Sequence, residues 1–152
     1  MPREPNLMAT PEAKKLETFH HHEATASIQT VPDVLDWAED VAGAHADLSP
    51  TAINVMVVCL LELVANIALH ASFDGVSPTV RVGLRIDAGV ITLAIGDNGA
   101  HFDPITDAPV WVDTDLATAR VGGRGLLIVR NLSRAMCYKR KGGWNCVRLE
   151  IA

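Results

Sequence analysis

The chain lacks an excess of positive charge. Its 152 residues include 13 Lys and Arg against 18 Asp and Glu, which gives a formal net charge of -5 at pH 7. Proteins that bind DNA or RNA neutralise phosphates with a basic surface. The charge balance therefore argues against direct nucleic-acid binding, and the basic stretch at 130–141 is typical of a solvated face or a small anion site.

Cysteine is also scarce. The chain has three cysteines, Cys59, Cys137 and Cys146, and an odd number without dense spacing indicates reduced thiols rather than a disulfide framework. Cys137 and Cys146 can face each other across a late hairpin, but we expect them to be free. Residues 1–15 lack the apolar core of an export signal, so the expected location is the cytoplasm.

Several motifs of catalysis are missing as well. No zinc-ligand signature, Walker phosphate loop or nucleophile elbow occurs in the chain. A serine hydrolase also needs a paired base and nucleophile, and the sequence shows no such pair. Chemistry in this chain must therefore come from a different combination of residues.

One long apolar run, residues 52–71, is long enough to span a bilayer. However, Glu62 lies at its middle, with Asn66 and His70 after it. A carboxylate at the centre of a membrane costs about 3 kcal/mol or more, and no basic flank supports insertion. We therefore expect no membrane association, and a buried helix in a globular domain.

Hydrophobic residues make up 49% of the chain, which is enough for a proper core. Residues 1–14 contain three prolines and mixed charge and are expected to be a flexible tail, while 15–152 form one domain. The expected elements are an edge strand within 15–30, helices over 30–48, 50–71 and 125–136, hairpin strands at 79–87 and 90–97, and a closing hairpin over 137–151. This order predicts an α+β two-layer sandwich with helices on one face of a mixed, mostly antiparallel sheet.

A row of polar residues interrupts the apolar helix expected over 50–71. Glu62, Asn66 and His70 are four residues apart, so they lie on roughly one helix face. A buried carboxylate needs water, a cation or a donor, and the oxygen of a neighbouring Asn suits a hard cation such as Mg²⁺. The row is either a metal-binding edge or a polar edge where the helix meets solvent.

Two glycine-containing segments follow. In IGDNGAHFDP, residues 95–104, Asp97 ends a strand and Gly99 permits close backbone approach, so the carboxylate can accept a hydrogen bond from an exocyclic amine. The alternative is a plain turn. In VGGRGLLIVR, residues 121–130, glycines just before a helix free the backbone to wrap an anion, and Arg124 adds charge. The alternative there is an ordinary helix start.

The three segments in this order resemble the nucleotide-binding boxes of the GHKL ATPase superfamily. ELVANIALHA is similar to the N box, DNGAHFDP to the first glycine box and GGRGLLIVR to the second. Together with the chain length, they resemble the small anti-sigma factor serine-protein kinases of the RsbW and SpoIIAB type, over roughly residues 25–151. This resemblance implies the histidine-kinase-like ATPase fold and the use of ATP and Mg²⁺.

The resemblance also implies roles for the matching residues. Glu62 is implied to be the base that orients the attacking hydroxyl, and Asn66 the ligand of Mg²⁺ on the ATP phosphates. Asp97 is implied to accept a hydrogen bond from the adenine amino group, with Gly99 letting the base approach. His70 is implied to have only a structural or supporting role.

The second glycine box is implied to border the phosphates and hinge a lid through Gly123, Arg124 and Gly125. The implied activity is transfer of the γ-phosphate of ATP to a serine of a partner, an anti-sigma factor antagonist of STAS fold. The phosphorylated antagonist no longer binds, and the kinase is free to hold a sigma factor. A homodimer through the sheet edge near 19–30 is a further implication.

Three positions depart from the pattern of such kinases. His101 stands where a glycine is common, Asp36 where many relatives carry a partner-facing arginine, and Trp144 interrupts the last hairpin. The departures at Asp36 and His101 motivate an alternative, a non-catalytic, nucleotide-sensing module that sequesters a sigma factor or another partner. A third reading, the detached ATPase half of a histidine kinase, fits less well because no dimerisation helices with a phospho-accepting His precede the boxes.

Overall fold

The computed structural model describes residues 19–72, 75–105 and 121–152, and for 121–124 it describes the backbone alone. The expected tail at 1–14 lies outside these ranges. The described elements are β1 (His20–Thr25), the short 3-10 turn η2 (Ile28–Thr30), α1 (Val31–Gly43), α2 (Pro50–His70), β2 (Thr79–Asp87), β3 (Val90–Asp97), α3 (Val121–Leu132), β4 (Ala135–Lys141) and β5 (Trp144–Ile151).

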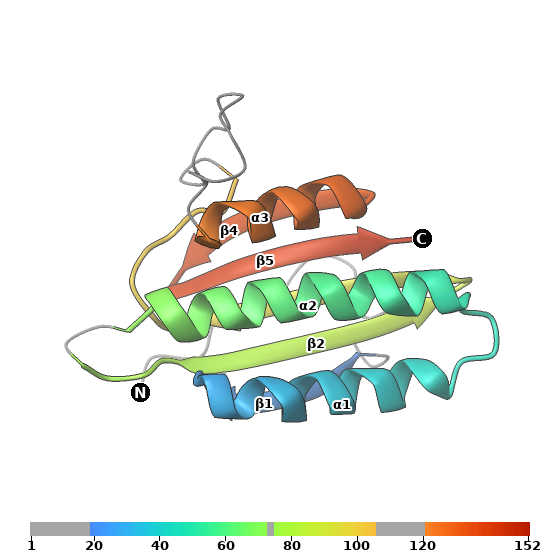
Figure 1. The fold of residues 1–152 in the computed structure, drawn as a ribbon, viewed down its shortest axis with the longest axis horizontal. Coiled ribbons are helices and arrows are strands. Elements are labelled where there is room, and N and C mark those ends of the chain that lie inside the picture. The colour runs from blue at the N-terminus through green and yellow to red at the C-terminus, as the bar shows by residue number, and fades with distance from the viewer. Residues whose placement is uncertain (1–18, 73–74, 106–120) are drawn as a thin grey trace.

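The five strands form one sheet in the order β1-β2-β3-β5-β4. Its register aligns apolar side chains across the strands, with Leu84 opposite Leu93 and Leu93 opposite Leu149. The three α-helices lie side by side over one face of this sheet, so the domain has two layers (Figure 1). The predicted α+β sandwich is confirmed. Every pairing among the described strands is antiparallel, so the sheet is more regular than the mixed one expected.

The hydrophobic core lies between α2 and the sheet. Along β3, Ile91, Leu93 and Ile95 lie on the face toward the helices, since alternate residues of a strand share a face. They are at most 2% exposed and belong to the core cluster. Met56 and Leu60 of α2 belong to the same buried cluster. Burying a side chain of this size contributes about 1.5–3 kcal/mol. This cluster fixes the central helix on the sheet and thereby positions the polar row that the helix carries.

Helix α2 begins where the sequence predicts and ends within one residue of the expected end. The Oγ of Ser49 accepts a hydrogen bond from the backbone N of Ala52 at 3.0 Å, and Pro50 occupies the first turn. Its mean hydropathy of 2.2 makes it the one helix in the described ranges that is long and apolar enough to cross a membrane. It packs on the sheet between α1 and α3 instead.

The prediction for the third helix was wrong at both ends. We expected a helix over 125–136, whereas α3 spans Val121–Leu132. The chain leaves the helix after Leu132 because the N–H of Arg134 donates to the carbonyl oxygen of Glu150 at 2.7 Å, which begins the pairing of β4 with β5. Met136, the last residue of the expected helix, lies in β4 opposite Leu149.

The cysteines are free, as expected. The register of the last hairpin sets Cys137 opposite Arg148 and Cys146 opposite Lys139, so the two cysteines are not direct cross-strand partners. Cys59 is fully buried in α2.

Candidate functional site

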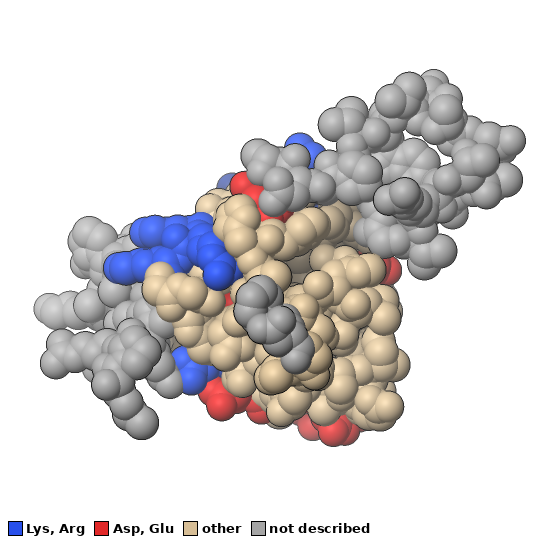
Figure 2. All heavy atoms as spheres, turned by 90° about the vertical axis from the view of Figure 1, so that its left-hand side faces the viewer, with Lys and Arg blue, Asp and Glu red and all other residues tan. Residues whose placement is uncertain are grey.

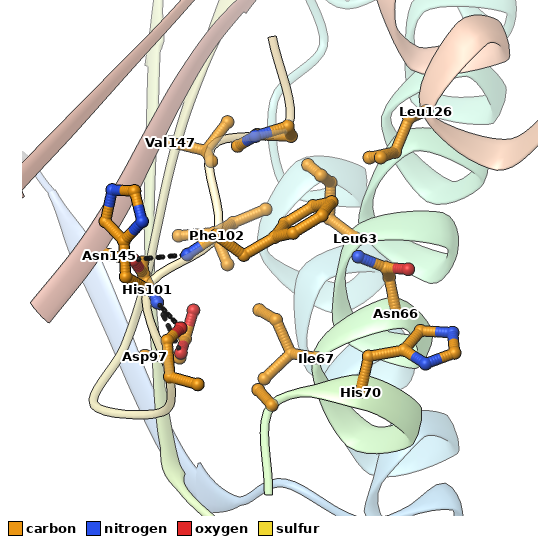
Figure 3. A pocket seen from close by; sticks show the side chains of 14 residues that line it. Leu63, Asn66, Ile67, His70, Asp97, His101, Phe102, Leu126, Asn145 and Val147 are labelled. Carbon is orange, nitrogen blue, oxygen red and sulfur yellow. Dashed lines mark hydrogen bonds between the residues drawn. The ribbon is translucent and has the colours of Figure 1, made fainter. Parts of the chain in front are cut away.

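A pocket opens at the end of the molecule where α2 ends. It is lined from the last turns of α2, the end of β3 and the residues after it, α3, and the start of β5 (Figure 3). Figure 2 faces this end and shows Lys and Arg side chains gathered on the side of the sheet, where the last three residues of β4 are exposed. The pocket walls are mainly apolar, and the polar side chains that reach it belong to Asn66, His70, Asp97, His101 and Asn145.

Asp97 supplies a buried carboxylate at the end of β3, where it is 6% exposed. Its Oδ1 accepts hydrogen bonds from the Gly99 N–H at 2.9 Å and from Nδ2 of Asn145 at 3.1 Å. In the described part of the chain no group donates to its Oδ2. Burial raises the pKa of Asp97 above its usual range, and the hydrogen bonds from Asn145 and Gly99 and the charge of Arg140 offset only part of that rise.

Gly99 lies where the segment after β3 passes the end of α2. A Cβ at this position would overlap with the carbonyl oxygen of Ala71 and would lie 2.7 Å from the Ala71 Cβ and 3.0 Å from Oδ1 of Asp97. The N–H of Ala100 donates to the same carbonyl at 3.4 Å. Glycine is therefore required for this close approach, which holds the floor of the pocket against the helix.

The polar row of α2 divides between two environments. Asn66 is half-buried and lines the pocket, across from Asp97, together with the exposed His70 (Figure 3). Glu62 is half-buried and does not line the pocket; its carboxylate lies against α3. The structure thus brings Asn66 and Asp97 to one cavity. It places Glu62 one turn before Asn66 on the same helix, outside that cavity.

The contact between Glu62 and α3 depends on Gly125. A Cβ on Gly125 would overlap with the Oε2 atom of Glu62 and would lie 3.0 Å from its Cδ. Only a residue without a side chain permits this approach of the two helices. Gly125 therefore serves the helix contact directly, in addition to any role near a ligand.

We expected the glycines of the 121–130 segment to precede the helix, but they lie within it. Helix α3 begins at Val121, so Gly123 and Arg124 lie in its first turn and Gly125 follows in the second. The expected role of the Arg124 side chain lies outside what the structure describes. The first turn of α3 still presents backbone N–H groups without partners inside the helix, together with the positive end of the helix dipole.

Sequence reasoning missed three residues that support Asp97. Asn145, Tyr138 and Arg140 join it through side-chain hydrogen bonds, with Asn145 at the centre. A signal for Asn145 exists, because it shares the inward side of β5 with Val147 and with two further apolar residues. A polar residue at an inward position of a strand needs partners.

The comparisons with known proteins identify the class of domain to which this fold belongs. The histidine kinase-like ATPase domain family matches residues 24–151, and the chain belongs to this family. Membership of an ATPase-domain family implies that the chain uses ATP.

Two similar proteins are informative. The serine/threonine-protein kinase BtrW of Bordetella bronchiseptica is 31% identical over 127 residues, which cover 84% of this chain and 89% of BtrW. The crystal structure of the RsbU and RsbW domains of Rv1364c from Mycobacterium tuberculosis superposes with a TM-score of 0.60 at 16% identity. That match covers 88% of this chain but 32% of the other chain, and it supports the fold alone.

Proposed function

We propose that the chain is an ATP-dependent serine-protein kinase that acts as an anti-sigma regulatory factor in a partner-switching circuit. Its substrate is the serine of a STAS-type antagonist. The observation that carries the proposal is the buried Asp97 carboxylate, which keeps Oδ2 unbonded within the described residues and lies across a pocket from Asn66. The likeness to BtrW, a serine/threonine-protein kinase, supports the same conclusion.

The pocket suits an adenine ring. Asp97 is an acceptor held at the end of a strand, and an exocyclic amine is the donor that such a group binds. Gly99 is assigned to the approach of the base, and its N–H donates to Oδ1 of Asp97 at 2.9 Å. The aliphatic side chains of Leu63, Ile67 and Val147 supply the apolar surface that an aromatic base needs.

The donor set also suits Mg²⁺ carried with the triphosphate. Among the described residues no group of three or more His, Cys, Asp or Glu side chains is placed to hold a metal ion. Mg²⁺ is usually bound through one or two protein oxygens together with phosphates and water. The side-chain oxygen of Asn66 is the protein ligand we assign, and the ion would neutralise charge on the phosphates.

Glu62 is assigned as the base. In the reaction the serine oxygen forms a bond to the γ-phosphorus, the bond from that phosphorus to the ADP oxygen breaks, and the hydroxyl proton passes to the Glu62 carboxylate. Glu62 lies one turn from Asn66, so base and metal ligand are set by the same helix. Gly123, Arg124 and Gly125 are assigned to the phosphates, next to the N-terminal end of α3.

The wider circuit follows from the same assignment. The partners are the unphosphorylated STAS antagonist and a sigma factor, which the kinase holds once phosphorylation has released the antagonist. The protein acts in the cytoplasm, and a homodimer through the exposed edge strand β1 is part of the proposal. Sedimentation that shows a monomer at high micromolar concentration would remove the dimer without touching the kinase assignment.

Phosphotransfer to a purified STAS partner with Mg-ATP tests the kinase. Glu62→Gln should retain ATP binding but slow transfer by at least about 100-fold, which is the usual contribution of a general base. Glu150→Gln is the matched control, because Glu150 lies on the face of β5 that points away from the helices. This variant should transfer phosphate at the wild-type rate. Unchanged transfer in Glu62→Gln would remove Glu62 from the mechanism.

Two observations favour a non-catalytic nucleotide sensor as the second candidate. His101 is exposed and lies edge-on to Tyr138 at 6.1 Å between ring centroids, where relatives often have a glycine. Asp36 is exposed on α1, where many relatives carry an arginine. Saturable ATP binding together with no transfer of the γ-phosphate to any STAS partner supplied would select this function.

A further inference from the structure

Asn145 is the most heavily bonded side chain at the pocket. It is the second residue of β5 and 4% exposed. Its backbone pairs with Arg140 of β4 on one side and with Asp97 of β3 on the other, so the three residues form a row across three strands. A buried amide in that position is stable only when its polar atoms have partners.

The acceptor side of the amide faces three donors. Oδ1 of Asn145 accepts from the hydroxyl of Tyr138 at 2.8 Å and from Nη1 of Arg140 at 2.8 Å. It also accepts from the backbone N–H of Phe102 at 3.3 Å. Nη1 of Arg140 in turn donates to the carbonyl oxygen of Gly99 at 3.3 Å.

The donor side of the amide faces two acceptors. Nδ2 donates to Oδ1 of Asp97 at 3.1 Å and to the carbonyl oxygen of Ala100 at 2.7 Å. Turning the amide over would set its NH₂ group against a guanidinium, a hydroxyl and an N–H, and its oxygen against a carboxylate. Only one orientation satisfies every group, so the network fixes the amide in place.

This fixed amide determines how Asp97 is presented. With Oδ1 bonded by Asn145 and by the Gly99 N–H, the carboxylate cannot rotate without losing both bonds. Its Oδ2 atom remains for a ligand. The same amide holds the chain after β3 through Ala100 and Phe102, whose side chain lines the pocket (Figure 3).

We propose that Asn145 is a positioning residue of the nucleotide site, which orients the Asp97 carboxylate toward the exocyclic amine of the base and fixes the pocket floor at 99–102. The inference rests on the proposed function, because it needs a nucleotide in this pocket. It extends that function to a residue that lies outside the three sequence boxes.

Asn145→Asp is the sharpest test because it changes one NH₂ group into an oxygen. The variant keeps the acceptor that binds Tyr138, Arg140 and the Phe102 N–H. It replaces the donor to Asp97 with a second carboxylate, so two like charges meet. Asn54→Asp, which adds the same charge on an exposed position of the first turns of α2, is the matched control.

We expect Asn145→Asp to bind ATP about tenfold or more weakly than wild type at pH 8, since a hydrogen bond to a charged group is lost and a repulsion is gained. As the pH falls toward 6, a proton shared by the two carboxyl groups restores a donor to Asp97, and the deficit should shrink. The charged and titratable groups that surround this pair are Arg140, Tyr138, Cys146, and the pocket residues His70 and His101. These groups are present in both proteins, so the affinity of the variant is expressed as a ratio to that of the wild type at each pH.

Calorimetric titration with ATP and thermal melting without ATP give the two readouts. An affinity ratio near one at every pH, or a deficit that does not change with pH, would overturn the inference, because the shared proton should restore the donor to Asp97. Tyr138→Phe removes one bond to the amide without adding charge and should weaken ATP binding by about two- to fivefold at all pH values.

Tyr138→Phe also keeps the question open to disproof if Asn145→Asp does not fold, since unchanged ATP affinity in that variant would contradict the network. If the wild-type protein binds no ATP, the proposed function fails together with this inference. If the wild type binds ATP and Asn145→Asp binds equally well, the inference about Asn145 fails alone.

Discussion

Gly125 of α3 lies so close to Glu62 of α2 that a methyl group on the glycine would overlap with the carboxylate. Helix α3 therefore approaches α2 at the residue assigned as the base. The second glycine box thus acts on helix packing and on the position of Glu62 at the same time. A contact between the second glycine box and a bound phosphate would be a different effect, and mutation of Glu62 alone does not test it.

Gly125→Ala should destabilise the protein by about 1–3 kcal/mol, the usual cost of overpacking a tight contact. It should also displace Glu62 and slow phosphotransfer. The control is Gly43→Ala at the end of α1, where a Cβ would meet no atom within 4 Å. There the higher helix propensity of Ala should leave stability unchanged or raise it slightly. Urea unfolding of both variants measures the effect, and equal behaviour of the two would contradict the contact.

Asp97→Asn should raise the melting temperature at pH 7 while it weakens ATP binding. Burial raises the pKa of Asp97 in the folded protein. The wild type therefore loses stability as the pH rises from the usual Asp pKa of about 3.9 through the raised value. The Asn variant carries no such penalty, and its side-chain oxygen can accept the same two hydrogen bonds.

The gain in melting temperature of Asp97→Asn should shrink as the pH is lowered toward about 3.9, where the wild-type carboxyl becomes protonated in both states. Asp87→Asn, exposed at the end of β2, serves as the control and should show little change. A gain for Asp97→Asn that is independent of pH would show that charge burial is not its cause.

One thiol should react quickly in the folded protein. Burial, with a smaller effect of Glu62, raises the pKa of Cys59 to about 11. Burial and the nearby Asp97 raise the pKa of Cys146 to about 11 as well. Cys137 is exposed. Because the thiolate is the reactive form, a chromogenic disulfide reagent at neutral pH should label Cys137 first. A fast phase that survives Cys137→Ser would contradict this assignment.

The elements with a strong local signal were predictable from sequence. Ser49 and Pro50 marked the start of α2, and Ala88-Gly89 marked the turn between β2 and β3, where both residues have positive φ. The end of α3 was not predictable in the same way. Met136 has helical spacing from Leu132, but it also fits the alternation of a strand, and pairing with β5 decides the outcome.

The site was predictable only in part for a similar reason. The segments that hold Asn66 and Asp97 each carry a local pattern, so both residues were selected before any contact was known. Asn145 is 48 residues from Asp97 in the sequence and meets it only because β5 pairs with β3. A hydrogen-bond network across three strands leaves no local pattern apart from a polar residue at an inward position.

The central claim is that Asp97 recognises an exocyclic amine on the base of a nucleoside triphosphate. Inosine triphosphate tests it most directly, because it differs from ATP in that the 6-amino group is replaced by an oxygen. The account predicts saturable binding of Mg-ATP by the wild type and at least about 100-fold weaker binding of inosine triphosphate. In Asp97→Asn the side-chain NH₂ group takes the place of Oδ2 and can donate to the inosine oxygen, so the preference for ATP should be lost or reversed. Equal binding of both nucleotides by the wild type, or no binding of either, would contradict it.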